Sequence, residues 1–300
     1  HYKNRIIEFI HEGFCVEVYA FERIGANKNI TQYPINIIAK ISNKNYIARL
    51  LIYYKSFKEI WNKHRKEDVI YFLGGLDIAM GFHYRNPKAK YIYEECDLTH
   101  TYTKLKKILE IIDKWVIRNS ELTIFTSEGF IEYHYGCNKH PQNICIIENK
   151  LNLSVVECCI EKKHDFINGK LSIGFVGSPR FDSIYNLIDV FCKNYPNYEF
   201  HIYGGPITEK FKILEKYHNC IFHGFFKNPD DLSSIYANID IVVATYDTRY
   251  ENVRYAEPNK LYEAICFCCP IIVSENTYLG EKVNKLKRLR KNISLIICLT

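Results

Sequence analysis

Two side chains of opposite charge open a helix in the second half of the chain. The segment EPNKLYEA, residues 257–264, places Lys260 and Glu263 three residues apart, just after Pro258. Proline suits a first helical turn, and residues three apart lie on one helix face. A lysine is unfavourable at the positive end of the helix dipole unless a bound anion compensates it. A ligand with phosphates near Lys260 and vicinal hydroxyls near Glu263 would satisfy both residues; a surface ion pair is the alternative.

Glycine-containing loops follow two β-rich segments of the same half. GFVGSPRFDS has Gly177 three residues before Arg180, and HIYGGPITEK contains Gly204. A backbone free of side chains and one guanidinium could both face an anion at the first loop, and phosphate is the natural candidate. A tight turn with a surface arginine would use the same residues.

These loops belong to a chain in which strand-like and helical patterns alternate. Helical patterns include residues 44–66, 103–119 and 183–194. The β-rich runs are FCVEVYAF, DVIYFLG, AKYIYEE and LTIFTS, followed by LSIGFVG, YEFHIYGG, CIFHGF, DIVVAT and PIIVS. Strands separated by helices indicate parallel βαβ units, in which ligands bind beyond the carboxyl ends of the strands. The pattern predicts an α/β fold of two Rossmann-like, doubly wound domains.

The domain boundary is predicted where this periodicity is lost. Residues 152–170 are polar and irregular, and 300 residues exceed what one compact core usually takes. We therefore expect an N-terminal, acceptor-side domain over residues 1–150, a linker over 151–170 and a C-terminal, donor-binding domain over 171–300.

Composition narrows the classes of partner. Hydrophobic residues at 47% and charged residues at 25% are ordinary globular values, and the net charge of +6 is scattered along the chain. This balance suits an anionic small ligand or a lipid surface better than nucleic acid, which would need a concentrated basic stripe. No apolar run approaches the ~20 residues that span a bilayer. We expect no nucleic-acid partner and, at most, peripheral membrane contact.

Cysteine usage and the start of the sequence bear on the compartment. The chain opens with HYKNRIIEFIHEGF, without an apolar signal segment, and most of its twelve cysteines lie in apolar runs. These features predict reduced thiols and a cytoplasmic location, either free or at the inner face of the membrane. Cys266 and Cys269 have C-x-x-C spacing, but no second ligand pair accompanies them, so no metal site is predicted.

Four ordered segments of the second half resemble one enzyme family. They are FVGSPRFDSIYNLIDVF, FHIYGGP, IFHGFFKNPDDLSSIYANIDIVVATYD and EPNKLYEAICFCCPIIVS. Together they resemble the C-terminal domain of GT-B nucleotide-sugar glycosyltransferases, particularly the retaining glycosyltransferase family 4 (glycosyl transferases group 1), which carries an E-x7-E signature. SELTIFTSEGFIEYHY and ICIIENKLN resemble, more weakly, the segments that close the N-terminal domain of such enzymes.

The resemblance implies a donor site built from five residues. Glu263 would hold the ribose hydroxyls, Arg180 and Lys260 the diphosphate, and Gly177 and Gly204 would allow close approach of the donor. The donor would be UDP- or GDP-linked. No D-x-D motif is placed to hold a metal on the phosphates, so no cofactor or metal is expected and side chains would supply the positive charge.

Two positions depart from the family pattern. The first signature glutamate falls on Tyr255, since Glu257 lies only six residues before Glu263, and Cys96 stands where many relatives carry a histidine near the donor sugar. Asp97, which follows Cys96, is the candidate catalytic residue. Glu95 and His100 are alternatives for the same role, and a solvated acidic loop is a further possibility.

The resemblance implies a function for the whole chain. It predicts a retaining glycosyltransferase that moves a sugar to a glycan or lipid-linked acceptor in a cleft between the domains, in surface polysaccharide biosynthesis. The chain lacks the first strand and the closing helix expected of the family, so we expect a truncated form. A weakly active or inactive nucleotide-sugar binding module is the alternative; a sugar-nucleotide epimerase fits less well.

Overall fold

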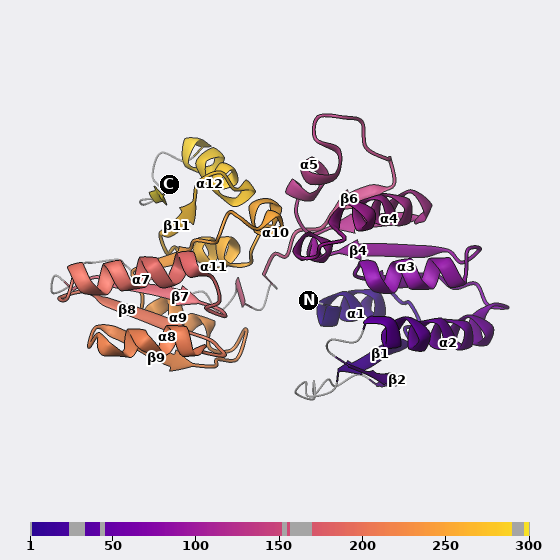
Figure 1. Ribbon diagram of the computed structural model, residues 1–300, viewed down its shortest axis with the longest axis horizontal. Helices are drawn as coiled ribbons and strands as arrows, with labels where there is room; N and C mark the ends of the chain where they lie inside the picture. The colour runs from indigo at the N-terminus through magenta and orange to yellow at the C-terminus, as the bar shows by residue number, and fades with distance from the viewer. Residues whose placement is uncertain are drawn as a thin grey trace. The chain divides into compact units, whose positions relative to one another are not determined.

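The computed structural model describes residues 2–23, 34–42, 46–151, 155–156, 170–289 and 297–299 (Figure 1). Its contacts divide the chain into two compact units. Unit 1 comprises His1–Phe125 and Lys139–Ile147, and unit 2 comprises Thr126–Asn138 and Glu148–Thr300. The domain limits at residues 150 and 170 stay a prediction, and most of the predicted linker lies outside the described residues.

Unit 1 is built on parallel strands. A four-stranded sheet has the order β3-β4-β5-β6, and β1 and β2 form a separate parallel pair. The bounds are β1 Val18–Arg23, β2 Ile35–Ile41, β3 Tyr71–Gly74, β4 Tyr91–Glu95, β5 Leu122–Phe125 and β6 Ile144–Ile146. Tyr91 and Tyr93 on β4 are both fully buried. β4 therefore runs through the core and delivers the loop after Glu95 to one edge of the sheet.

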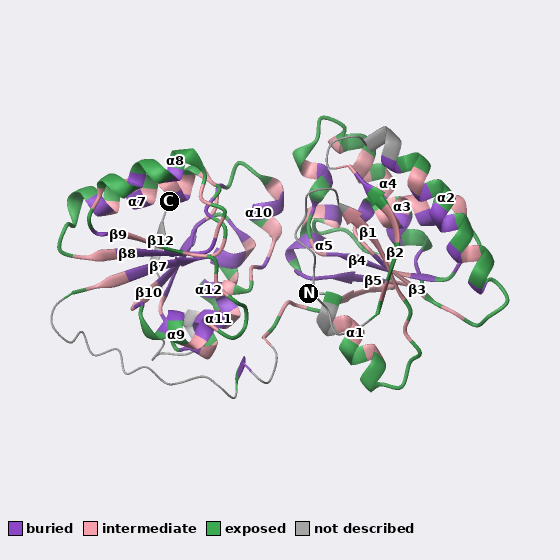
Figure 2. Ribbon diagram, turned by 90° about the horizontal axis from the view of Figure 1, so that it is seen from below, coloured by how far each residue is buried: buried purple, intermediate pink, exposed green. Residues whose placement is uncertain are grey.

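Helices cover both faces of this sheet. Figure 2 shows α1 on one side and α2, α3 and α4 on the other. The bounds are α1 Tyr2–His11, α2 Tyr46–His64, α3 Leu76–Arg85 and α4 Lys106–Asn119, with a 3-10 turn η1 at Thr99–Tyr102. The rings of Phe9 and Phe72 join α1 to β3, with centroids 5.5 Å apart.

Unit 2 has a six-stranded parallel sheet of order β12-β11-β10-β7-β8-β9. Its strands are β7 Ser172–Val176, β8 Glu199–Tyr203, β9 Cys220–Gly224, β10 Ile241–Ala244, β11 Ile271–Ser274 and β12 Ile297–Leu299. The chain moves outward from β7 to β9 and then returns to β10 on the other side of β7. This reversal is the dinucleotide-binding topology, whose ligands lie at the carboxyl ends of the strands where the order switches. Here that point lies between β7 and β10.

Two apolar cores flank the sheet of unit 2. One joins Phe175 on β7 to Ile184 and Ile188 on α7. The other joins Val176 to Leu261 on α11 and Tyr236 on α9. The helices are α5 Gly129–Tyr135, α7 Asp182–Asn194, α8 Glu209–Lys212, α9 Leu232–Ala237, α10 Glu251–Tyr255, α11 Lys260–Cys266 and α12 Tyr278–Leu289, with η2 at Ile213–Lys216.

The described helices and cysteines test two sequence expectations. None of the helices within the described ranges is both long and apolar enough to cross a bilayer. Eight cysteines of the described residues lie outside disulfide bonds, namely Cys15, Cys96, Cys137, Cys145, Cys192, Cys220, Cys268 and Cys269. Cys266 is disulfide-bonded, so the expectation that every thiol is reduced is wrong there. Pairing depends on proximity in the fold, which an apolar sequence context does not reveal.

A partly buried charge network connects α12 to the segment that leads into α11. The Lys282 ammonium lies 2.5 Å from Glu148 Oε1 and 2.5 Å from Glu257 Oε1. The Tyr262 hydroxyl also donates to Glu257. Burial raises the pKa of Glu148, but hydrogen bonds from Lys282, Tyr262 and Lys150 outweigh it and lower that pKa to about 2. One ammonium thus holds two carboxylates from distant parts of the chain.

Replacing Lys282 by Met should destabilise unit 2, because two carboxylates would lose their shared cation. We expect a loss of roughly 3 kcal/mol in the free energy of unfolding at neutral pH, measured by chemical denaturation. The lowered pKa of Glu148 stabilises the folded state above the unfolded pKa of about 4.5, and this contribution disappears as the pH falls to about 2. The variant should lack that part of the acid dependence.

Lys216→Met is the matched control for this change. Its ammonium pairs with Asp189 at 3.1 Å, but the lysine side chain is half exposed, and exposed pairs contribute little. Equal stabilities of the two variants would contradict a structural role for the Lys282 network.

Candidate nucleotide site

The backbone at Gly177 lies against the ammonium of Lys260. Gly177 follows β7 with φ +139°, and a Cβ placed there would lie 3.0 Å from Lys260 Nζ. Gly204, after β8, has φ +119°, and its Cβ would lie 2.2 Å from the Gly177 carbonyl oxygen. Both positions need glycine because their backbones pack closely and adopt positive φ. The structure therefore brings Gly177, Gly204 and Lys260 together.

Aromatic groups hold the Lys260 ammonium in place. The Nζ atom donates to the Tyr246 hydroxyl at 3.2 Å. It also lies 4.9 Å from the centroid of the Phe175 ring and 5.5 Å from that of Tyr246. Within the described part of the chain, the Lys260 ammonium forms no ion pair with a carboxylate, and these cation–π contacts stabilise its charge. Lys260 is thus a cation positioned by rings and available to an anion.

Glu263 lies one turn further along α11 and is buried. It is 4% exposed, and its Oε2 accepts a hydrogen bond from the Tyr236 hydroxyl at 2.8 Å. Burial raises the pKa of Glu263, while the Tyr236 hydrogen bond and the charge of Lys260 act in the opposite direction. The carboxylate is therefore fixed by α9 and senses the Lys260 charge.

Arg180 lies on the exposed side of the loop after β7. Its guanidinium stacks over the Phe181 ring, 4.9 Å from the centroid. Phe181 in turn meets Tyr246 edge-on, with centroids 6.0 Å apart. Arg180 and Lys260 are therefore joined through two aromatic rings rather than by direct contact.

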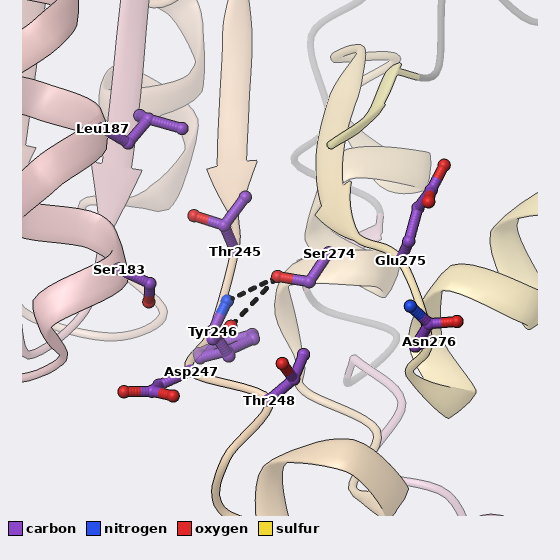
Figure 3. Close-up of a pocket in the computed structure, with 9 residues that line it drawn as sticks. All are labelled: Ser183, Leu187, Thr245, Tyr246, Asp247, Thr248, Ser274, Glu275 and Asn276. Atoms are coloured by element: carbon purple, nitrogen blue, oxygen red, sulfur yellow. Dashed lines mark hydrogen bonds between the residues drawn. The ribbon is translucent and has the colours of Figure 1, made fainter. Parts of the chain in front are cut away.

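A pocket of about 330 Å³ opens beside these residues. Figure 3 shows its lining, which comes from the start of α7 and the loops after β10 and β11: Ser183, Leu187, Thr245, Tyr246, Asp247, Thr248, Ser274, Glu275 and Asn276. The Ser274 hydroxyl accepts from the Tyr246 amide at 2.9 Å and donates to the Tyr246 carbonyl at 3.1 Å. The two loops are therefore fixed together at the switch point of the sheet.

Several of these groups escaped the sequence analysis. The buried Ser183 Oγ and Thr245 Oγ1 have no hydrogen-bond partner among the described residues, so they could serve a ligand. Asp247, by contrast, is held by Arg249, whose guanidinium lowers the pKa of Asp247 by hydrogen bonding. The signal was present in DIVVATYDT, a strand followed by polar residues, to which the same search for strand ends applies.

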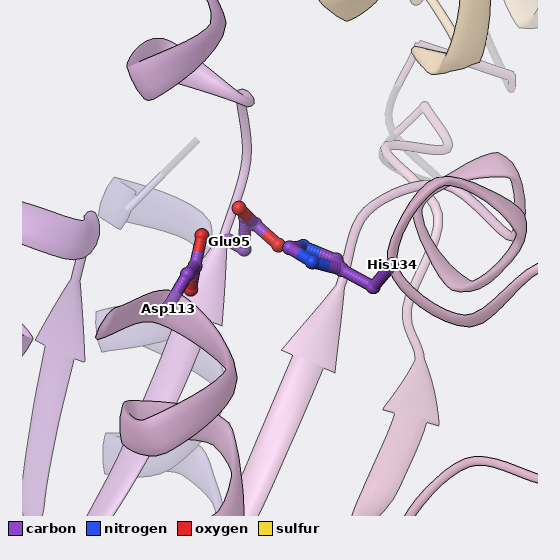
Figure 4. A group of neighbouring side chains, drawn as sticks. All are labelled: Glu95, Asp113 and His134. Atoms are coloured by element: carbon purple, nitrogen blue, oxygen red, sulfur yellow. The ribbon is translucent and has the colours of Figure 1, made fainter. Parts of the chain in front are cut away.

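The loop after β4 contains the candidate catalytic residues of unit 1, and the structure distinguishes them by burial. Asp97, the predicted catalytic residue, is exposed, whereas Glu95 and His100 beside it are buried. Figure 4 shows Glu95 next to Asp113 of α4, and their oxygens lie within 4.8 Å. His100 Nδ1 lies 3.3 Å from Asp113 Oδ2. Asp113 was missed, although it falls on the apolar face of α4 with Val116 and Ile117, where a charge is conspicuous.

Burial sets the protonation of Glu95. It raises the pKa of Glu95 to about 8, and the charge of Asp97 acts in the same direction, whereas the neighbouring Asp113 side chain lowers it. Glu95 is therefore a neutral acid at neutral pH.

The two departures from the family signature also have defined surroundings. The Tyr255 carbonyl accepts a hydrogen bond from Ser127 Oγ at 2.6 Å, and the Tyr255 ring packs against Tyr133. Glu257 Oε1 is held by Lys282. Cys96 Sγ lies 3.6 Å from the Tyr2 hydroxyl. All three residues are thus engaged by neighbours of their own unit, and neither Tyr255 nor Cys96 supplies the carboxylate or imidazole that the signature would place there.

Substituting Glu95 by Gln tests the neutral acid. A carboxyl whose pKa rises on folding binds more protons in the folded state, so stability falls as the pH rises from about 4.5 to about 8. Glu95→Gln mimics the neutral form and should remove that decline, so that the variant gains on the parent with rising pH in urea denaturation. The exposed Glu121→Gln is the control. A difference between parent and variant that does not change with pH would contradict the raised pKa.

Known proteins match the chain at the level of fold and of one segment. Residues 170–290 match the family model described as Glycosyl transferases group 1. Sucrose-phosphate synthase from Thermosynechococcus elongatus is 12% identical, with 92% of this chain and 75% of that one covered and a TM-score of 0.68. HepE from Anabaena, in complex with UDP and glucose, is 12% identical, with 89% of this chain and 72% of HepE covered and a TM-score of 0.61.

The lipopolysaccharide outer core galactosyltransferase WaaB, in its apo form, is 16% identical over 87% of this chain and 77% of that one, with a TM-score of 0.55. No curated protein matches the sequence. The resemblance recognised in the sequence and the α/β fold class are thereby confirmed. The chain has the fold of the GT-B glycosyltransferases, and its residues 170–290 match the glycosyl transferases group 1.

Proposed function

We propose that the chain transfers a sugar from a UDP- or GDP-linked donor to a glycan or lipid-linked acceptor, with retention of configuration, in surface polysaccharide biosynthesis. The observation that carries this proposal is the Lys260 ammonium, which lies against the Gly177 backbone at the switch point of unit 2. A fixed cation at that edge suits a diphosphate.

The donor diphosphate would lie between Lys260 and Arg180. Charge builds up on the diphosphate as the glycosidic bond breaks, and a cation positioned in advance stabilises it without reorganisation. The rings of Phe175 and Tyr246 supply that positioning. Gly177 and Gly204 would keep the approach to the backbone open. The proposal assigns no metal to this step, since side chains supply the positive charge.

Glu263 would hold the ribose. A carboxylate accepts two vicinal hydroxyls, and Oε2 of Glu263 is already oriented by Tyr236. Burial of the carboxylate strengthens hydrogen bonds to it, because water competes less. The pocket hydroxyls of Ser183 and Thr245 have no hydrogen-bond partner among the described residues, so they would be able to bind the donor.

Asp97 is proposed as the catalytic polar group on the acceptor side. It is exposed just beyond the carboxyl end of β4, the edge at which sheets of this kind bind ligands. Glu95 is buried, whereas Asp97 is exposed, so Asp97 is the better placed of the two to contact a substrate.

The similar structures support the donor and acceptor classes. HepE is described in complex with UDP and glucose, and WaaB as a galactosyltransferase of the lipopolysaccharide outer core. By analogy, a UDP-linked donor and a lipid-linked glycan acceptor are proposed here. The cytoplasmic side of the membrane is the proposed location.

A catalytically weak nucleotide-sugar binding module is the second candidate. Tyr255 in place of the first signature glutamate favours it, since this aromatic ring packs on Tyr133. Glu257, the nearest carboxylate, is held by Lys282. A binding module would keep Lys260 and Glu263 but lack turnover.

Calorimetry with UDP and GDP, combined with a donor-hydrolysis assay on UDP- and GDP-sugars, separates the two candidates. A transferase binds the diphosphate and turns the donor over, whereas a binding module only binds it. Turnover should persist in excess EDTA. Absence of binding to either diphosphate would remove both candidates.

Glu263→Gln should weaken nucleotide binding and leave the fold intact. Glutamine keeps an oxygen for the Tyr236 hydroxyl but loses the charge, and charge-assisted hydrogen bonds contribute about 1.5 to 3 kcal/mol. We expect UDP or GDP affinity to fall roughly tenfold or somewhat more, by titration calorimetry, with an unchanged Tm. Glu209→Gln, in which an 87% exposed carboxylate is changed, is the control.

Lys260→Ala should have a different signature, because its proposed partner is phosphate. It should weaken UDP strongly and uridine hardly at all, whereas Glu263→Gln weakens both. If Glu263→Gln bound nucleotides as tightly as the parent, the ribose assignment would be wrong. If Lys260→Ala reduced uridine and UDP equally, the phosphate assignment would be wrong.

A further inference from the structure

Helix α4 carries an apolar stripe that faces solvent. Leu105, Ile108, Ile111 and Trp115 are 59%, 57%, 70% and 39% exposed. Their spacing of three or four residues places them along one side of the helix and the turn before it. An exposed apolar row of this length on one element indicates a surface that something covers.

The stripe is not the side that builds the core. Val116 and Ile117 of the same helix are fully buried, and α4 covers one face of the sheet of unit 1 (Figure 2). α4 therefore has two apolar sides, of which folding uses one. A helix that served only as a cover for the sheet would be polar on the other.

The charges beside the stripe share one sign. Lys104, Lys107 and Arg118 are exposed and Lys114 is partly so. The acids of the helix are withdrawn from this surface, because Glu110 is paired with Lys106 at 3.6 Å and is only 28% exposed, while Asp113 is fully buried. The exposed charge along α4 is thus basic.

The other two helices on this side of the sheet, α2 and α3, also carry exposed apolar side chains (Figure 2). Leu51 and Tyr54 of α2 and Tyr84 of α3 are 65%, 50% and 75% exposed, and the Arg85 guanidinium lies 4.8 Å from the Tyr54 ring centroid. α2 and α3 each carry one exposed acid, Glu59 and Asp77. Of these three helices, α4 is therefore the one whose exposed apolar residues have only basic exposed charges beside them.

We propose that the exposed side of α4 binds the surface of an anionic lipid bilayer. Leucine, isoleucine and tryptophan beside lysine and arginine are the pattern of a helix that lies in the membrane interface, and tryptophan favours the headgroup level. Protein interfaces, by contrast, are depleted in lysine, and the exposed Lys107 would need an acidic partner there. Phospholipid headgroups supply that negative charge over the whole face.

The exposed side of α4 would make the peripheral membrane contact that the sequence predicts. Lipid binding there does not depend on glycosyl transfer. Vesicle binding can be measured without nucleotide or acceptor. If the chain bound lipid but no nucleotide, the membrane surface would be supported and the proposed function would be wrong. If it bound nucleotide but no lipid, the proposed function would be supported and the membrane surface would be wrong.

Flotation with phosphatidylcholine vesicles, with and without phosphatidylglycerol, tests the surface. The chain should float with the anionic vesicles, and added salt should weaken the binding. Ile108→Ser combined with Ile111→Ser should weaken it roughly tenfold or more, and Lys107→Gln about fivefold. Val190→Ser, on the exposed side of α7 at 56% exposure, is the control and should bind like the parent.

Fluorescence of Trp115 gives an independent reading in a Trp61→Phe background. Emission should shift to the blue when anionic vesicles are added. Equal binding by the double isoleucine variant, no binding to anionic vesicles, or no spectral shift would overturn the proposal. So would a dimer of the parent that the double isoleucine variant abolishes, because a second copy would then be the occupant.

Discussion

The contact between the Gly177 backbone and the Lys260 ammonium is the constraint on which the rest of unit 2 depends. A methyl group at Gly177 would push the ammonium away, and one at Gly204 would collide with the Gly177 carbonyl. The ends of β7 and β8 can therefore approach this closely only with glycine at position 204, and the positive φ of Gly177 also favours glycine beside the start of α11. Because β7 borders the switch point, that convergence places a fixed cation where a sheet of this order binds phosphates.

The two units hold their ionisable side chains in different ways. In unit 2, the Lys282 ammonium pairs with both Glu148 and Glu257, and hydrogen bonding to it lowers the pKa of Glu148. In unit 1, Glu95 has a pKa of about 8 and remains protonated at neutral pH. The first arrangement fixes α12 and the entry to α11, and the second leaves Asp97 as the exposed carboxylate of its loop.

Much of the architecture could be predicted from the sequence because periodicity and strand ends are local properties. The β-rich runs form strands, and the loops at Gly177, Gly204 and Lys260 meet as parallel topology requires. Long-range partners could not be predicted in this way. The Tyr236 hydroxyl on Glu263, the carboxylate of Asp113 beside Glu95 and the bonded state of Cys266 all depend on which surfaces meet after folding.

A crystal structure of the chain soaked with UDP, and separately with GDP, tests the central claim most directly. The account predicts diphosphate oxygens within about 3 Å of Lys260 Nζ, next to the Gly177 backbone, with the ribose hydroxyls on Glu263. Lys260 should then exchange its hydrogen bond to Tyr246 for one to phosphate. A nucleotide bound elsewhere, with Lys260 still on the Tyr246 hydroxyl, would contradict it.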